Sequence, residues 1–148
     1  MIGIIDDKDK AILELLREHG DYTTRQIARK TLLPPTTINN RIRKLKQDGV
    51  IRKFTVALDP VAMEQDFKVY VLISADLLTL KEKKKTQYDM VSELRKLPAV
   101  ESADIVSGGT DIVVTVKVKD RQEYDRLLLG RIQLIDGVER TQSLIVIH

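Results

Sequence analysis

Two adjacent prolines, Pro34 and Pro35, constrain the fold of the N-terminal part of the chain more than any other feature. Neither residue has a backbone N–H to donate, so a regular helix cannot continue through both of them. Residues 25–31 and 35–47 flank the turn and carry apolar side chains at helical spacing. Proline is also favoured in the first turn of a helix, where Pro35 stands. With a further helix expected over residues 6–18, the sequence predicts three helices, the last two joined by the tight turn of a helix-turn-helix.

The expected helix over residues 35–47 has an apolar stripe and a polar face. Ile38, Ile42 and Leu45 recur on one side of the helix and are expected to pack on a core. The polar side chains suit a helix in the major groove of DNA, because Asn can pair with adenine, Arg with guanine, and Thr with a thymine methyl group or a phosphate. A solvated helix face is the alternative interpretation. The candidates for this DNA-binding face are Thr36, Thr37, Asn39, Asn40 and Arg43.

Basic side chains gather around this helix. Residues 24–53 contain nine Lys or Arg and one acid, Asp48, whereas the whole chain has a net charge of only +3. A merely solvated surface usually mixes both signs, so this local excess indicates a surface that approaches phosphates. Such contacts add affinity without sequence information. The candidates for binding the DNA backbone are Arg41, Lys44, Lys46, Arg52 and Lys53.

After Gly49 the apolar pattern changes from helical spacing towards alternation, which predicts a strand over residues 50–58 that ends at Asp59-Pro60. The rest of the chain reads as strand, helix, strand, strand, helix, strand. The segment Leu97–Glu101 recurs in altered form as Ile135–Glu139, and two such halves predict a ferredoxin-like βαββαβ sandwich. The expected strands cover residues 69–73, 100–106, 112–118 and 141–147, and the expected helices cover 88–97 and 121–134.

These patterns predict an α+β fold with two domains. The helix-turn-helix domain is expected over residues 1–50, a strand connector or hinge over 51–65, and the βαββαβ domain over 66–148. Within the second domain, Tyr70 and Leu72 place apolar groups opposite the alternating face of the first strand. Helices cover one face of such a sheet, so a second chain would be needed to cover the other. We therefore expect a homodimer, whose two helix-turn-helix units would favour a pseudo-palindromic DNA site.

Short motifs on both halves of the chain add a family resemblance. They are D-x-x-D-x-x-I-L from Asp6, N-R-I-x-K-L from Asn40, G-V-I from Gly49, D-P at Asp59, a Gly-Gly-Thr-Asp loop from Gly108 and G-V-E-x-T from Gly137. In this order they resemble the Lrp/AsnC (feast/famine) transcriptional regulators over almost the whole chain. Two positions depart from that pattern: Pro34 stands where the family usually has a helix-capping Ser, and Thr110 where it often has an aromatic residue.

The resemblance implies a winged helix-turn-helix that binds double-stranded DNA, and a second domain that dimerises and often assembles further, into octamers or other particles. It also implies that a small amino-acid effector binds at the second domain. Backbone N–H groups of a glycine turn can hold a carboxylate and an Asp can accept from an ammonium, although the same turn is also what a plain hairpin needs. The positions implied for the effector are Gly108, Gly109, Thr110, Asp111, Thr141 and Ser143.

The residues offer little chemistry for catalysis. The chain has no cysteine, and neither His19 nor His148 stands beside a plausible nucleophile or metal partner. We therefore expect no catalytic residue, metal or cofactor, and the apolar runs are too short for a membrane span. The expected location is the cytoplasm, on the nucleoid. Two alternatives stay open: a haem-precursor (siroheme-type) decarboxylase subunit of similar architecture, and a non-specific architectural DNA protein.

Overall fold

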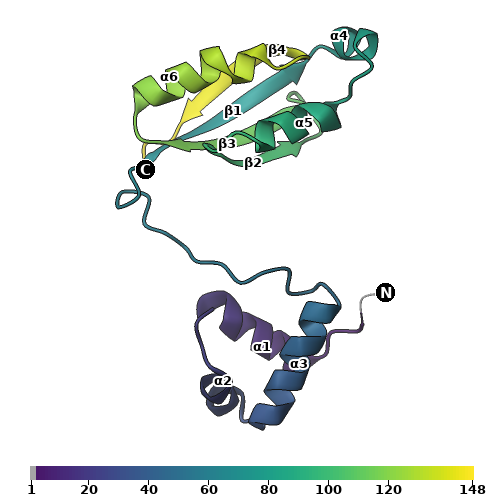
Figure 1. Ribbon diagram of the computed structural model, residues 1–148, viewed down its shortest axis with the longest axis vertical. Helices are drawn as coiled ribbons and strands as arrows, with labels where there is room; N and C mark the ends of the chain where they lie inside the picture. The colour runs from purple at the N-terminus through teal and green to yellow at the C-terminus, as the bar shows by residue number, and fades with distance from the viewer. Residues whose placement is uncertain (1–2) are drawn as a thin grey trace. The chain divides into compact units, whose positions relative to one another are not determined.

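Three helices form the N-terminal unit. The structure, a computed structural model, describes residues 3–148 and divides the chain into two compact units that meet in sequence at Ala57 and Leu58 (Figure 1). The first unit contains α1 (Asp7–Glu18), α2 (Thr24–Thr31) and α3 (Pro35–Gln47). All three predicted helices are confirmed, and α3 has the predicted bounds because the prolines define its start.

Side chains at the helix starts explain where α1 and α2 begin. Asp6 accepts a hydrogen bond from the Asp9 N–H at 2.8 Å, and the Asp9 carboxylate accepts from the Asp6 N–H at 3.2 Å. This reciprocal capping box satisfies two backbone donors that the helix itself leaves unpaired. Thr23 and Gln26 form the same arrangement at α2. By contrast, α3 follows Pro34 without any side-chain cap.

The apolar stripe of α3 packs on the core of the first unit. Ile38 and Leu45 are buried and Ile42 is half-buried, as the spacing of these residues predicts. Burial of this stripe fixes which side of α3 faces outward, because the rotation of an amphipathic helix is set by its apolar face. The buried residues of this core cluster are Ile12, Ile27, Ala28 and Ile38.

The turn between α2 and α3 holds a leucine in the left-handed region. Leu32 has a φ of +57°, a conformation that costs an L-residue about 1–2 kcal/mol and that glycine usually occupies at a helix end. Its side chain is 89% exposed, so packing does not offset this strain. The turn is therefore held by its neighbours rather than by its own residue preference.

The expected strand in the connector is absent. Among residues 3–148 the structure has one sheet, and residues 52–59 belong to no strand. Phe54, Val56 and Leu58 alternate as a strand would, but their side chains are exposed. Alternation describes only the side-chain pattern, whereas a strand also needs a neighbouring backbone to pair with, and the single chain offers none here. The prediction of a strand was wrong for the chain alone.

The second unit is a four-stranded antiparallel sheet in the order β2-β3-β1-β4. Figure 1 shows α5 and α6 lying along this sheet, with α4 beside the end of β1. The βαββαβ order of the predicted ferredoxin-like domain is confirmed, with α4 as an additional short helix. The elements are β1 (Phe67–Ala75), α4 (Leu77–Glu82), α5 (Gln87–Arg95), β2 (Val100–Ile105), β3 (Ile112–Val118), α6 (Arg121–Gly130), the 3-10 helix η1 (Ile132–Leu134) and β4 (Val138–Ile145).

One face of the sheet carries the core and the other does not. Alternate residues of β1 and β3 are fully buried in a cluster that includes Met90, Leu94 and Tyr124 from α5 and α6. On the opposite face Tyr70 and Leu72 are only half-buried. The apolar character of both faces of β1 is thus real, but within one chain only one face is covered by helices.

Several boundaries of the second unit differ from those predicted, and the largest differences lie near the end of the chain. The helix expected to reach residue 134 ends at Gly130 and is followed by η1, while β4 begins at Val138 and ends at Ile145. The helix α4 was not predicted, although Asp76 caps it by accepting from the N–H groups of Leu78 and Thr79 at 3.0 and 3.1 Å. Among residues 3–148, no helix combines the length and apolarity needed to cross a membrane.

Candidate nucleic-acid interface

The outward side of α3 presents the polar residues predicted from its spacing. With Ile38 and Leu45 buried, the opposite side of the helix is in solvent. Thr37 is half-buried, at the edge of this face. The arrangement gives a rigid helix with amide, hydroxyl and guanidinium groups directed outward, which are the groups that read base edges in the major groove. The exposed members are Thr36, Asn39, Asn40, Arg43, Lys44 and Lys46.

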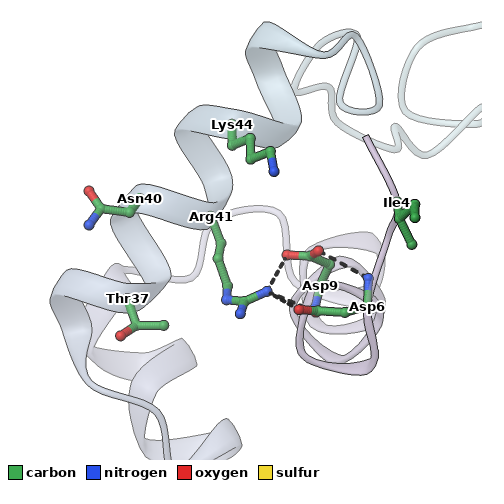
Figure 2. A pocket seen from close by; sticks show the side chains of 7 residues that line it. All are labelled: Ile4, Asp6, Asp9, Thr37, Asn40, Arg41 and Lys44. Carbon is green, nitrogen blue, oxygen red and sulfur yellow. Dashed lines mark hydrogen bonds and ion pairs between the residues drawn. The ribbon is translucent and has the colours of Figure 1, made fainter. Parts of the chain in front are cut away.

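The two neighbouring asparagines differ in what they contact. Thr24 Oγ1, in the first turn of α2, donates to Asn39 Oδ1 at 2.7 Å, so Asn39 also ties α2 to α3. No hydrogen bond joins the Asn40 side chain to another residue of the described range 3–148, and Figure 2 shows it projecting from α3 away from Arg41. Asn40 can therefore offer both its donor and its acceptor to a base, whereas Asn39 has its acceptor engaged.

Arg41 turns towards α1 instead of outward. Its Nη1 group donates to Asp6 Oδ2 at 2.7 Å, to Asp6 Oδ1 at 2.8 Å and to Asp9 Oδ1 at 2.9 Å (Figure 2). Hydrogen bonding to Arg41 is the main reason that the pKa of Asp6 falls from 3.8 to about 2, and the pKa of Arg41 is raised in turn. The geometry of Arg41 does not support the expectation that it binds a DNA phosphate, because its guanidinium is already hydrogen-bonded to two carboxylates.

A hollow of about 370 Å³ lies where α3 passes the first turn of α1. Arg41 and the two aspartates line it together with Thr37, Asn40, Lys44 and Ile4 (Figure 2). The hollow is therefore part of the same helix surface that carries the candidate DNA-binding residues. It contains two acids, which no pattern near α3 in the sequence indicates.

The remaining basic candidates lie at the end of α3 and just after it. Lys46 Nζ lies 4.9 Å from the centre of the Phe54 ring, a cation–π contact that holds the first residues of the connector against α3. Arg52 and Lys53, between them in sequence, are exposed. These cations form a basic extension of the α3 surface within the first unit.

The loop expected to bind an effector joins β2 to β3. Gly108 and Gly109 are exposed there, and Gly108 has a φ of +135°. Asp111 is half-buried: its N–H donates to the Ile73 carbonyl at 3.0 Å, and its Oδ2 accepts from the Ala75 N–H at 2.8 Å. Asp111 therefore fastens the loop to the end of β1, and Thr110 beside it is half-buried.

The two hydroxyl candidates point elsewhere. Thr141 and Ser143 pair with buried residues of β1, so their side chains face the helices. Gln133 Nε2 donates to Thr141 Oγ1 at 2.9 Å, and the Ser143 hydroxyl is hydrogen-bonded to the Tyr124 hydroxyl. The six effector candidates thus do not form one cluster, because β1 separates the loop from Thr141 and both hydroxyls already have partners in the chain.

Sequence reasoning missed the contact between Arg41 and the two acids of α1. The partners are 35 and 32 positions apart in sequence, so no local spacing links them. The only signal was the aspartates themselves, which mark the start of a helix. Among residues 3–148 no group of three or more His, Cys, Asp or Glu side chains is arranged to hold a metal ion.

Two family models together match nearly the whole chain. Residues 5–52 match a winged helix-turn-helix DNA-binding domain, and residues 70–148 match the Lrp/AsnC ligand binding domain. The HTH-type transcriptional regulator FL11 of Pyrococcus furiosus is 34% identical over 147 residues, which cover 99% of this chain and 92% of that protein.

Solved structures show the same fold. AsnC of Escherichia coli has a TM-score of 0.84 and 25% identity, covering 99% of this chain and 94% of that one. The transcriptional regulator NMB0573 of Neisseria meningitidis, solved as a complex with L-methionine, has a TM-score of 0.88 at 23% identity, covering 98% and 91%. These matches are to transcriptional regulators, which are not enzymes, and they remove the decarboxylase alternative. The chain belongs to the Lrp/AsnC family of DNA-binding transcriptional regulators.

Proposed function

We propose that this regulator reads DNA sequence with the outward side of α3. The observation that carries the proposal is the contrast between the two sides of this helix: Ile38 and Leu45 fix its rotation, and Asn40 and Arg43 stand exposed on the other side. In the major groove, Asn40 would pair with adenine and Arg43 with guanine, with Thr36 beside them. Lys44, Lys46, Arg52 and Lys53 would bind backbone phosphates.

The functional unit in this proposal is a homodimer on a pseudo-palindromic site. The helix-free face of the sheet carries Tyr70, Leu72 and Val113, all half-buried, and beside them Leu144, which is exposed. An apolar sheet face of this kind is suited to packing against a second copy. Dimers would then present two α3 helices to DNA, on the nucleoid in the cytoplasm, and larger assemblies such as octamers would follow from further contacts. A stable monomer in sedimentation at micromolar concentration would contradict this part of the proposal.

We further propose that an amino acid modulates DNA binding through the loop from Gly108 to Asp111. The support is the matched ligand binding domain and the L-methionine in the Neisseria meningitidis structure. Gly108 and Gly109 are exposed, and backbone N–H groups of such a turn suit a carboxylate. Thr141 and Ser143 have partners already and contribute less. Calorimetric titration with L-methionine, with Gly109→Pro as the loop variant, tests this; binding that is unchanged in the variant would refute the role of the loop.

The DNA proposal is tested by a salt series on two duplexes. One duplex is selected by the wild-type chain from a randomised pool, and the other is a scrambled duplex of the same composition. Asn40→Ala should cost about 1–3 kcal/mol on the selected duplex and almost nothing on the scrambled one, while Lys46→Ala should weaken both alike and flatten the salt dependence. Arg126→Ala, an exposed position on α6, is the charge-matched control. Equal affinity of the wild type for both duplexes would instead indicate a non-specific architectural protein.

A further inference from the structure

Arg41 is the one residue of the predicted basic set that forms ion pairs with carboxylates of the described residues. Its side chain is 25% exposed and that of Asp9 is 13% exposed, so the contact between them is partly shielded from water. Asp6 adds a second carboxylate on the more open side, with 50% exposure. The interaction of a partly buried cation with two acids is stronger than a single exposed ion pair, and it restricts the geometry of the side chains more.

The acids that hold Arg41 are the same two that form the N-terminal cap of α1. The Asp6 and Asp9 side chains accept hydrogen bonds from each other's backbone N–H groups, and these bonds position both carboxylates independently of Arg41. The guanidinium then joins that fixed pair to the middle of α3. Rotation or sliding of α3 against α1 would break three hydrogen bonds at once.

The location of the cluster also bears on DNA binding. Thr37, Asn40 and Lys44 line the same hollow as the two acids, so the carboxylates lie beside the surface that approaches phosphates. Without a cation between them, Asp6 and Asp9 would oppose the approach of a DNA strand. Arg41 therefore both offsets part of the negative charge of the two acids and restrains the helix that carries the base-reading residues.

We propose that Arg41 is a positioning residue for DNA recognition: through Asp6 and Asp9 it sets the angle and register of α3, and it is not a phosphate contact. This inference rests on the proposed role of α3 in reading DNA. It predicts that Arg41 contributes to the discrimination between sequences, in contrast to a phosphate contact, which contributes equally to all of them.

The experiment compares Arg41→Met with two matched controls. Arg52→Met is the same substitution at an exposed residue proposed to bind a phosphate, and Arg43→Met is the same substitution at an exposed base-reading residue of α3. Affinities for the selected and scrambled duplexes are measured in a salt series, at a temperature well below thermal unfolding. Asp9→Asn and the double variant with Arg41→Met complete a double-mutant cycle. Hydrogen exchange of peptides from α1 and α3 in the full chain reports whether the two helices separate more easily.

We expect Arg41→Met to reduce the ratio of selected to scrambled affinity about fivefold. It should lower the salt slope on scrambled DNA by less than half of the fall seen for Arg52→Met. A full phosphate contact would lower that slope by about 0.9. Asp9→Asn should reduce the ratio in the same direction, the double variant should lose no more than Arg41→Met alone, and exchange in α1 and α3 should quicken in all three.

Opposite results would overturn the inference. If Arg41 bound a phosphate, Arg41→Met would lower the slope as much as Arg52→Met, and Asp9→Asn would free the guanidinium and raise affinity for both duplexes. Additive losses in the cycle, or unchanged hydrogen exchange, would equally refute a role through Asp9. If Arg43→Met alters binding to neither duplex, the proposal that α3 reads DNA fails. Hydrogen exchange of the single and double variants still decides whether Arg41 joins α1 and α3.

Discussion

Gly137 offers a sharp test of the packing between α4 and the start of β4. Its φ is +91°, and a Cβ added there would lie 2.6 Å from Leu80 Cγ and 3.1 Å from Met90 Sδ. Both neighbours are buried, so neither side chain can move into solvent. The backbone is held as well, because the Gly137 carbonyl accepts from the Asp76 N–H at 2.8 Å. The methyl group of an alanine at this position would therefore clash with the buried side chains of Leu80 and Met90.

The expected cost of Gly137→Ala has two parts. A positive φ costs an L-residue about 1–2 kcal/mol, and forcing a methyl group into a packed core costs about 1–3 kcal/mol. We expect the free energy of unfolding of the second unit to fall by about 3 kcal/mol. Two variants of the same unit separate the parts: Gly108 has a φ of +135° with no heavy atom within 4 Å of an added Cβ, and Gly109 has the open space without the positive φ.

Urea unfolding followed by circular dichroism, with hydrogen exchange of β4 peptides to identify the unit that opens, measures all three variants. Gly109→Ala should stay within about 0.5 kcal/mol of wild type and Gly108→Ala should show the backbone cost alone. If Gly137→Ala is no worse than Gly108→Ala, the steric contact with Leu80 is not real. If it is as stable as wild type, both the backbone conformation and the packing described for Gly137 are wrong.

Three further changes have expected outcomes. Leu32→Gly should raise the free energy of unfolding of the first unit by about 0.5–1 kcal/mol. The left-handed strain that is relieved is larger than the entropic cost of ordering a glycine, and little packing is lost; a lower unfolding midpoint in calorimetry would contradict this. Acid should weaken the fold in a defined window, since Arg41 lowers the folded pKa of Asp6 and Lys83 and Lys85 lower that of Asp136, each from 3.8 to about 2. That stabilisation is present above the unfolded pKa of 3.8 and is lost as the pH falls towards 2; acid titration of Asp6→Asn with Asp136→Asn should show a shallower loss in that window than wild type, and an identical curve would refute it. Tyr124→Phe should cost about 1 kcal/mol in urea unfolding by removing the hydrogen bond to Ser143, and it should be non-additive with Ser143→Ala; additive losses would show that the two hydroxyls are independent.

Sequence alone predicted the elements whose limits are set by local chemistry. The helix α3 was placed at its observed bounds because Pro35 starts it and Gly49 follows its end. β3 was placed at Ile112–Val118 because an apolar residue occupies every second position from Ile112 to Val118. The strand expected after Gly49 failed, since alternation shows which side chains match but not whether a backbone partner exists.

The candidate site was predictable to the level of the helix face and no further. Helical spacing located Asn40 and Arg43 on the outward side, but it could not reveal that Arg41 would meet two acids more than 30 positions away. Likewise, the hydroxyls of Thr141 and Ser143 are chemically suited to bind an effector. In the sheet, however, they pair with Ile73 and Val71, so both side chains lie on the face that the helices cover. Pairing register and distant charge partners are tertiary properties, which single-residue patterns do not encode.

The two hydrophobic clusters, one around Ile12 and Ile38 and the other around Val71 and Leu94, have no buried residue in common. A substitution that repacks one cluster therefore leaves the packing of the other unchanged, and stability effects from the two should add. Each half can accumulate changes at its own pace, so the proposed DNA-target preference and the proposed effector preference can diverge separately over evolutionary time. The same independence makes the chain suited to recombination. If the residues before the connector are replaced by those of a relative, the chimaera should take the DNA preference of the relative and keep the proposed effector response of this chain.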